Sequence, residues 1–294
     1  MNTVTVKAYA KINLGLDVLR KRADGYHDVC MIMQSLELHD KVTIHKKKDE
    51  GIVVRTNLSY LPCNQDNLVY KAAALFIQTQ GIKDGLFLEL EKYIPVAAGL
   101  AGGSSDAAAT LIGLNQMYQT GLPLVELQKL GVKLGADVPY CLMLGTALSE
   151  GIGEVLTTLP SMPACTILLV KPDISVSTKY VYENLKLNES SLHPDIDSMK
   201  KALSNRDLYT LTKTMDNILQ SVTVKDYPII SDIKDKMKEL GALTSLMSGS
   251  GPTVFGIYQN RELAKKALNY FRKHRNYGKQ VILTTPYWPM QEHQ

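Results

Sequence analysis

Several features that mark large classes of protein are scarce or missing in this sequence. The four cysteines, Cys30, Cys63, Cys141 and Cys165, are scattered, with no Cys-x-x-Cys pair and no histidine partner at zinc-like spacing. This pattern argues against a disulfide framework and against a cysteine-based metal site. It indicates free thiols in a reducing compartment.

Signals for membranes and for nucleic acids are also lacking. The N-terminus shows no charged-then-apolar signal pattern, and no uninterrupted apolar stretch is long enough to span a bilayer. The formal net charge is only +4, from 33 Lys and Arg against 29 Asp and Glu, and the charges are dispersed. We therefore expect a cytoplasmic protein that binds neither nucleic acid nor membrane, with a charge that suits a small anionic ligand.

What is present is an ordinary globular composition, with 45% hydrophobic and 21% charged residues in a chain of 294, long enough for two domains. In the first half, alternating or apolar segments predict strands and segments with a helical period predict helices. The expected strands cover residues 3–9, 12–19, 35–46, 51–56, 85–92 and pieces of 143–159, and the expected helices cover residues 67–79, 104–118 and 123–134. Between Arg20 and Asp28 the segment is polar, and Asp24 and Gly25 within it are typical of a hairpin turn.

A break between Pro160 and Pro163 marks the predicted domain boundary, with an N-terminal domain of residues 1–160 and a C-terminal domain of residues 161–294. Beyond it, strands are expected at 166–171, 243–247, 253–258 and 280–284, and helices at 178–186, 195–203, 206–221, 228–240 and 261–274. The final helix–strand–strand–helix–strand order predicts an antiparallel sheet backed by helices. The fold class is therefore α+β.

The most informative segment is residues 95–106, in which glycines, alanines and serines precede an alanine-rich stretch predicted to be helical. Glycine lets a backbone approach an anion closely, and the first turn of a helix leaves unpaired N–H groups with partial positive charge. Loop and helix start together predict a phosphate site. The segment lacks the Gly-Lys-Ser/Thr ending of a Walker loop and the glycine spacing of a dinucleotide fingerprint. The alternative is a flexible loop before a serine-capped helix.

A second loop rich in glycine and serine covers residues 247–253, between two predicted strands. By itself it is typical of a plain hairpin turn. Two such loops, one in each predicted domain, could instead approach a polyanion from opposite sides of a cleft.

Lys11 and Asp137 are the candidates for phosphoryl-transfer chemistry, which needs a cation near the phosphate and a carboxylate near the acceptor hydroxyl. Lys11 lies in a largely apolar strand-like segment, where an unpaired charge is costly unless the ammonium reaches water from an edge strand. Asp137 lies between a predicted helix end and an apolar run, where a cap or turn aspartate is the alternative. Spacing alone leaves both alternatives open.

Five segments occur in the order typical of one enzyme superfamily: residues 10–14 (Ala-Lys-Ile-Asn-Leu), 24–27 (Asp-Gly-Tyr-His), 95–105, 135–139 (Gly-Ala-Asp-Val-Pro) and 249–251 (Gly-Ser-Gly). On these motifs the whole chain resembles the galactokinase, homoserine kinase, mevalonate kinase and phosphomevalonate kinase (GHMP) superfamily. The first two segments are specific to a member whose acceptor carries cytidine diphosphate. The resemblance implies a two-domain GHMP kinase fold, with an N-terminal domain like ribosomal protein S5 domain 2, a ferredoxin-like C-terminal domain and the active site between them.

The resemblance also implies roles on the donor side. Asp137 takes or orients the proton of the acceptor hydroxyl, while Lys11 keeps Asp137 ionised and stabilises charge on the transferring phosphoryl group. ATP enters with Mg²⁺, and backbone N–H groups of the first loop wrap its phosphates. The residues of this ATP-binding loop are Pro95, Val96, Ala97, Ala98, Gly99, Leu100, Ala101, Gly102, Gly103, Ser104 and Ser105. Either serine could approach Mg²⁺, but the sequence identifies no carboxylate ligand.

A further group of residues is implied to bind the acceptor. Tyr26 stacks on the cytosine and His27 hydrogen-bonds to the edge of the base. Tyr182 is a candidate for the opposite face, with a helix-surface tyrosine packed at the domain interface as the alternative. Asn13 contacts the polyol or helps to fix the catalytic aspartate. The residues implied to close over the phosphates of substrate or nucleotide are Gly249, Ser250 and Gly251.

The implied reaction is transfer of the γ-phosphoryl group of ATP to the 2-hydroxyl of a cytidine diphosphate-linked polyol, for isoprenoid precursor biosynthesis, by a monomer or homodimer. One alternative is a GHMP kinase that acts on mevalonate, homoserine or a sugar and therefore needs no base-recognition pair. The other is an RNA-binding module, which a ribosomal-type fold allows. The mild charge and the lack of a basic-aromatic stripe argue against RNA binding.

Overall fold

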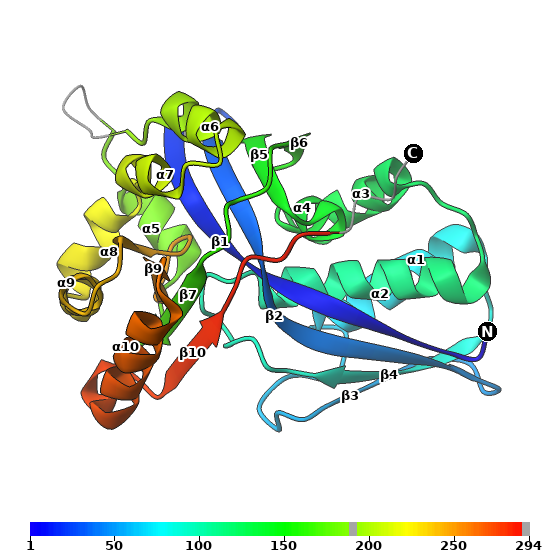
Figure 1. Cartoon of the computed structure of the whole chain (residues 1–294). Coiled ribbons are helices and arrows are strands. Elements are labelled where there is room, and N and C mark those ends of the chain that lie inside the picture. The colour runs from blue at the N-terminus through cyan, green and yellow to red at the C-terminus, as the bar shows by residue number, and fades with distance from the viewer. Residues whose placement is uncertain (188–192, 290–294) are drawn as a thin grey trace. The chain divides into compact units, whose positions relative to one another are not determined.

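The computed structural model describes residues 1–187 and 193–289. The chain forms two compact units that are interleaved along the sequence (Figure 1). Unit 1 consists of Met1–Ala10, Leu38–Val96 and Ala101–Leu144. Unit 2 consists of Lys11–Glu37, Ala97–Leu100 and Gly145–Gln294. Each unit is therefore assembled from segments that are distant in sequence.

The first two strands are much longer than the sequence predicts. β1 runs over Thr3–Lys21 and pairs with β2, which runs over His27–Lys47. The prediction of two separate strands at 3–9 and 12–19 is wrong, because Lys11 does not interrupt the ladder. The ammonium of Lys11 is buried and donates to Asn13 Oδ1 on the same strand, so a charge that looks like a break is accommodated inside the sheet.

The predicted turn between these strands is confirmed. The backbone N–H of Arg22 donates to Tyr26 O at 2.8 Å, and Gly25 has a φ of +88°, a conformation that glycine adopts without strain. Asp24 Oδ1 accepts from Tyr26 N at 3.0 Å, which closes an aspartate turn of the expected kind.

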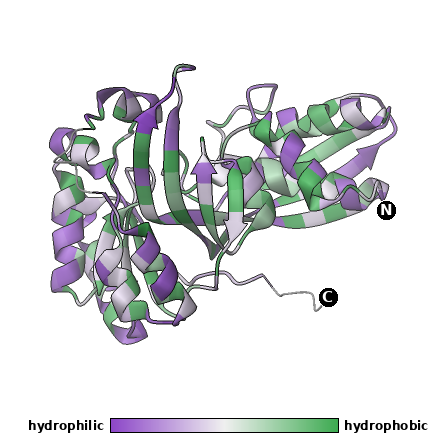
Figure 2. Cartoon of the chain, turned by 90° about the horizontal axis from the view of Figure 1, so that it is seen from above, coloured by the Kyte–Doolittle hydropathy of each residue, from purple (hydrophilic) through white to green (hydrophobic). Residues whose placement is uncertain are grey.

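Unit 1 contains the outer part of a six-stranded sheet and the helices that pack with it. β3 (Ile52–Thr56) is parallel to β4 (Gly85–Glu91), which is antiparallel to β2. The strands show alternating apolar and polar bands, the pattern of a sheet with one buried face (Figure 2). The helices of unit 1 are α1 (Leu68–Gln80), α2 (Gly102–Tyr118), α3 (Leu124–Val132) and α4 (Val138–Met143).

The first three of these helices were expected, and α4 was not. Its six residues form an apolar run with proline in the first turn. Proline is tolerated there because backbone N–H groups of the first turn have no partner within the helix. α4 packs against α2 and α3, so tertiary contacts stabilise a helix that is too short to be recognised from its own period.

Unit 2 contains a second, four-stranded sheet in which every neighbouring pair is antiparallel. Its strands are β7 (Thr166–Lys171), β8 (Thr244–Met247), β9 (Val254–Tyr258) and β10 (Gln280–Thr284), in the spatial order β10-β7-β9-β8. α9 (Ile229–Glu239) packs on β8 and β9, and α10 (Arg261–Lys273) packs on β7 and β10. The predicted antiparallel sheet backed by helices is confirmed, with a ferredoxin-like strand order.

The remaining elements of unit 2 are short. β5 (Thr146–Gly151) pairs with β2, and β6 (Val155–Thr158) pairs with β5. The short helices are α5 (Thr178–Asn184), α6 (Ile196–Ser204), α7 (Leu208–Thr214), α8 (Gln220–Asp226) and the 3₁₀ helix Arg275–Tyr277. No helix among the described residues is both long and apolar enough to cross a membrane.

The prediction of one helix over residues 206–221 is wrong, because the chain leaves the helix after α7 and forms α8 only from Gln220. Between them, Leu16 of β1 donates its N–H to Asp216 O at 3.0 Å and accepts from Ile218 N at 3.0 Å. Pairing with a strand 200 positions earlier thus replaces the local helical hydrogen bonds, a preference that the local sequence does not encode.

Candidate functional site

The first glycine loop joins β4 to α2 and has an unusual backbone. Ala97, Gly99 and Ala101 have φ values of +50°, +74° and +55°. Such left-handed alanines cost free energy and persist where the surroundings impose them, often at ligand clamps. Ala101 is the N-cap of α2, and no side chain caps this helix. The serine-capped alternative is therefore wrong, and the first turn presents the partial positive charge of its N–H groups.

The two glycine loops are in direct contact within unit 2. Ser248 Oγ donates to Gly99 O at 2.9 Å. A Cβ on Gly99 would lie 2.2 Å from Ser248 O, so only glycine fits against the second loop. The second loop is the hairpin between β8 and β9, closed by Ser248 N donating to Thr253 O at 2.9 Å. The hairpin and the contact with the first loop coexist.

Asn217 holds the second loop, and the sequence offered no signal for it. Its Nδ2 donates to Met247 O and to Gly249 O, both at 2.8 Å, and its Oδ1 accepts from Leu219 N at 3.0 Å. The side chain is 1% exposed. Since the residues on either side of Asn217 pair with Leu16, this one amide connects the second loop to β1.

Lys11 and Asn13 complete this group of unit 2. Lys11 N donates to Leu100 O at 3.1 Å, which joins β1 to the first loop. Lys11 Nζ donates to Asn13 Oδ1 at 2.8 Å, and the two residues are 5% and 0% exposed. The alternative of a lysine reaching into water is therefore wrong. A Cβ on Gly249 would lie 3.7 Å from Asn13 Oδ1, so the second loop borders the same pair.

Asp137 lies in unit 1, at the N-cap position of α4, but its side chain makes no capping bond there. Its carbonyl accepts from Cys141 N at 3.0 Å, and Cys141 Sγ lies 3.3 Å from Ser105 Oγ in the first turn of α2. Asp137 is therefore one helical turn from the contact that joins the two helices. Ser105 Oγ also donates to Tyr9 O, and Ser105 is buried, whereas Ser104 is half-buried and is the more accessible of the two loop serines.

The predicted base-binding residues lie in unit 2. The rings of His27 and Tyr182 are 5.2 Å apart between centroids, at 41°. Burial, and secondarily the charge of Lys21, lowers the pKa of His27 below its usual value, so the imidazole is neutral near pH 7. A neutral imidazole offers one donor and one acceptor. Tyr26 is 60% exposed and extends from the turn between β1 and β2.

A buried charged cluster flanks the first glycine loop in unit 1. Lys92 Nζ donates to Asp106 Oδ2 at 2.7 Å and to Asp40 Oδ2. Asp40 Oδ1 also accepts from the backbone N–H groups of Tyr93 and Ile94, whereas Asp106 Oδ1 has no partner among the described residues. Lys92, Asp40 and Asp106 are far apart in the sequence, so the cluster can be recognised only from the folded structure.

The protonation of this cluster follows from its geometry. Burial, reinforced by Asp40 and opposed by Lys92, raises the pKa of Asp106 to about 8. Burial alone would lower the pKa of Lys92, but the two carboxylates outweigh it and raise that pKa. The cluster therefore holds a charged lysine, and Asp106, the carboxyl with fewer donors, is the one that takes up a proton.

In residues 1–187 and 193–289, no group of three or more His, Cys, Asp or Glu side chains could hold a metal ion. The residues around the first loop instead suit a phosphate chain, with a helix start and Ser104 as polar groups.

Comparisons with known proteins agree with this geometry. The family models described as GHMP kinases N terminal domain and GHMP kinases C terminal match residues 67–145 and 199–276. A 4-diphosphocytidyl-2-C-methyl-D-erythritol kinase of Lachnoclostridium phytofermentans is 57% identical over 284 residues, 97% of each chain. A crystal structure of 4-(cytidine 5'-diphospho)-2C-methyl-D-erythritol kinase is similar with a TM-score of 0.83 at 30% identity, over 97% of this chain and 100% of that one.

A homoserine kinase from Cytophaga hutchinsonii has the same fold, with a TM-score of 0.81 at 21% identity over 97% of this chain and 95% of that one. The expected two-domain fold is thus confirmed by sequence and by structure. The chain belongs to the GHMP kinases and carries both the N-terminal and the C-terminal domain of that family.

Proposed function

We propose that this protein transfers the γ-phosphoryl group of ATP to the 2-hydroxyl of 4-diphosphocytidyl-2-C-methyl-D-erythritol, giving ADP and the 2-phosphate, in isoprenoid precursor biosynthesis. The observation that carries the proposal is a hydrogen-bonded group in unit 2 that connects Lys11 with both glycine loops. Lys11 N donates to Leu100 O of the first loop, and Gly99 O of that loop accepts from Ser248 of the second loop. The substrate named for the 57% identical relative supports the choice of acceptor.

The donor side is built from backbone groups. The left-handed residues of the first loop turn its peptide groups, and the uncapped start of α2 adds partial positive charge for the β- and γ-phosphates of ATP. Mg²⁺ bound with the nucleotide neutralises phosphate charge. Ser104 is the loop hydroxyl more accessible to that ion, since Ser105 is buried.

The acceptor hydroxyl loses its proton to Asp137, or is oriented by it, as it attacks the phosphorus atom. Lys11 stabilises the carboxylate and the charge on the transferring group. Asn13 accepts a hydrogen bond from the ammonium of Lys11, so it fixes where that charge lies. This assignment requires Lys11 of unit 2 and Asp137 of unit 1 to act on the same substrate molecule.

The cytosine end supplies binding energy remote from the reaction, which positions the hydroxyl for attack. A neutral His27 matches the base edge, because cytosine presents acceptors at O2 and N3 beside a donor at N4. Tyr182 holds the ring of His27 from one side. Tyr26, exposed on the turn, provides the stacking face, and the loop of Gly249, Ser250 and Gly251 closes over phosphate groups.

We also propose a cytoplasmic monomer or homodimer, with the family's N-terminal and C-terminal domains divided at residue 160 along the sequence, a division different from that of the two interleaved compact units. The two family matches support this division, because one ends at residue 145 and the other begins at residue 199.

The direct test is a substrate panel with the purified protein. ADP release with ATP and Mg²⁺ should depend on 4-diphosphocytidyl-2-C-methyl-D-erythritol, and phosphorus NMR should show one new phosphate monoester. Mevalonate and homoserine are the matched alternatives. Equal or faster turnover with either would replace the proposed acceptor, and no phosphorylation of any acceptor would remove the kinase proposal.

A further inference from the structure

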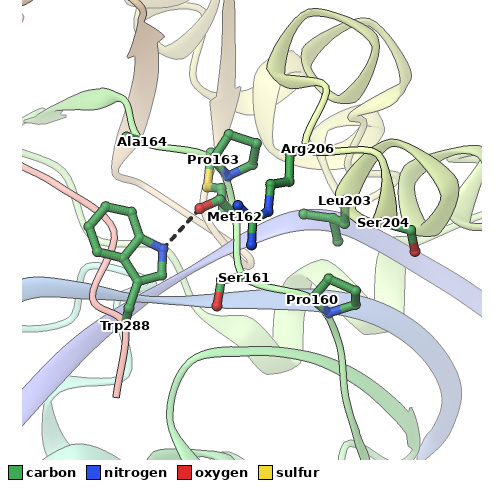
Figure 3. A pocket seen from close by; sticks show the side chains of 9 residues that line it. All are labelled: Pro160, Ser161, Met162, Pro163, Ala164, Leu203, Ser204, Arg206 and Trp288. Atoms are coloured by element: carbon green, nitrogen blue, oxygen red, sulfur yellow. Dashed lines mark hydrogen bonds between the residues drawn. The ribbon is translucent and has the colours of Figure 1, made fainter. Parts of the chain in front are cut away.

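A pocket of about 630 Å³ lies in unit 2, and none of its residues belongs to the proposed kinase site (Figure 3). Its walls are residues 160–164, the end of α6 with the turn that follows it, and Trp288. This volume falls in the usual range for small-molecule sites, roughly 300–1,000 Å³. The Pro160–Pro163 break, which the sequence presents only as a boundary, forms the floor.

The two sides of the pocket are held by a buried polar chain. Trp288 Nε1 donates to Met162 O at 2.9 Å, the dashed line in Figure 3. Met162 N donates to Thr146 Oγ1 at 3.1 Å, and that hydroxyl donates to Gln34 Oε1 at 2.6 Å. Gln34 Nε2 donates in turn to Tyr287 O at 3.1 Å. A fully buried glutamine thus positions both the floor of the pocket and the tail that carries Trp288.

The lining has one cation and no acidic residue. The Arg206 side chain extends toward Ser161 and Met162 in Figure 3, and its guanidinium makes no hydrogen bond or ion pair within the described part of the chain. The carboxylate of the adjacent Asp207 is directed to α7, which it caps by accepting from Thr210 N at 3.0 Å.

The turn after α6 places Arg206 at the pocket. Arg206 has a φ of +54°, and its N–H donates to Leu203 O at 3.1 Å in the turn after α6. Trp288, 39% exposed, lies on the other side of the 160–164 segment from Arg206 and Leu203 (Figure 3). A molecule lying across that segment meets the indole of Trp288 on one side and the guanidinium of Arg206 on the other.

We propose that this pocket binds a small organic anion, a phosphate or carboxylate carried on a flat apolar body. The guanidinium of Arg206 forms paired hydrogen bonds with the oxyanion, as its planar fork favours. The apolar body covers the proline-rich floor and contacts Trp288. The proposal is independent of the kinase activity.

Trp288 is the single tryptophan of the 294-residue chain, so tryptophan fluorescence reports on a residue that lines this pocket. The purified full chain is titrated with phenyl phosphate, with benzoate, and with the two halves of the first probe, inorganic phosphate and phenol. Phenyl phosphate should change the emission with saturation and a Kd on the order of 1 mM. Each half should bind at least about tenfold more weakly, and the ratio for benzoate tells phosphate from carboxylate preference.

The variants separate this site from others. Arg206→Gln should weaken phenyl phosphate binding at least about tenfold, Arg206→Lys should have an intermediate effect, and Arg272→Gln on the exposed face of α10 should have none. Arg206 is exposed, so melting temperatures of the variants should match the parent. The absence of a saturable change overturns the proposal, as does unchanged affinity in Arg206→Gln. Loss of the signal under saturating ATP, with no effect of Arg206→Gln, would assign the probe to the nucleotide site instead.

Discussion

In unit 1 the strand that leads into the first glycine loop is held by a buried lysine between two carboxyl groups, whereas in unit 2 both loops are held by buried amides and hydroxyls. In the ionic cluster of Lys92, Asp40 and Asp106, the attraction between charges opposes a large desolvation cost. Its net contribution to the free energy of unfolding therefore depends on which of the three groups are charged. The hydrogen bonds of the Asn217 amide involve no titrating group, so their contribution to stability depends on geometry alone. Stability should therefore respond to pH at the ionic cluster of unit 1 and to side-chain shape at Asn217 of unit 2.

The largest effect is expected for Asp137, the proposed catalytic carboxylate of unit 1, which lies outside the ionic cluster of that unit. Asp137→Ala should lower kcat by about 10²–10⁴-fold, because the acceptor hydroxyl loses its base or orienting group. The Kd for ATP and the melting temperature should change little. Asp66→Ala, an exposed aspartate of the same unit, is the control. Near-normal turnover of Asp137→Ala would exclude this role.

Lys92→Met should unfold the protein more easily without acting on the reaction itself. It leaves the carboxyl groups of Asp40 and Asp106 buried with no cation, and breaking such a pair costs about 3–5 kcal/mol. Equilibrium urea unfolding measures the loss, with Lys83→Met at an exposed site of unit 1 as the control. If both variants lose the same stability, the ion pairs of Lys92 do not stabilise unit 1.

Asn217→Ala tests the neutral side. The carbonyls of Met247 and Gly249 lose a donor each, and the expected cost is about 2–3 kcal/mol. The loss should be the same at pH 6 and pH 8, since no titrating group is removed. Asn184→Ala, whose amide bonds Tyr180 O at an exposed site, should stay within about 0.5 kcal/mol of the parent. A loss that varied with pH would contradict the contrast between the units.

Asp106→Asn addresses the pH dependence directly. The folded state raises the pKa of Asp106 from 3.8 to about 8, so folding takes up a proton in this window and the contribution to stability is lost as pH rises through it. The asparagine mimics the protonated carboxyl and removes that slope. Relative to the parent, the variant should gain on the order of 2 kcal/mol between pH 6 and pH 8 in urea unfolding. Parallel pH profiles would show that Asp106 does not titrate there.

The smallest effect is expected for the contact between the loops. Ser248→Ala removes one hydrogen bond, from Oγ to Gly99 O, at a cost of about 1 kcal/mol. Under the proposed function the first loop becomes less well placed, so the KM for ATP should rise while kcat changes less. Ser231→Ala on α9 is the control. An unchanged KM and melting temperature would mean that the contact does not position the loop.

Much of the fold was predictable where local signals agree. Residues 67–79 and 261–274 have a helical period and form α1 and α10. The structure shows that the side chains of Asn67 and Asn260 accept from the first turns of these helices, the position that asparagine favours. The strand at 166–171 is confirmed to the residue as β7, because an apolar run bounded by prolines has few other solutions. These elements need no partner to be recognised.

The candidate site was predictable only in part. The two glycine loops, Lys11 and Asp137 stand in recognisable motifs, and their assigned roles stay predictions until the variants are measured. Asn217 and Lys92 lie in unremarkable segments, and their importance comes from carbonyls and carboxylates that are distant in sequence. A single polar residue with no local motif carries no sign of its partner.

By itself the sequence determined the family, most helices and strands, and the motifs that point to phosphoryl transfer, because these depend on neighbouring residues and on short segments. Only the tertiary structure decided that β1 continues through Lys11, that the helix expected at 206–221 is divided, and that the two glycine loops touch at Gly99. Each of these outcomes depends on hydrogen bonds between distant segments. Such bonds outweigh local preference, because a buried polar group must find its partner wherever the fold supplies one.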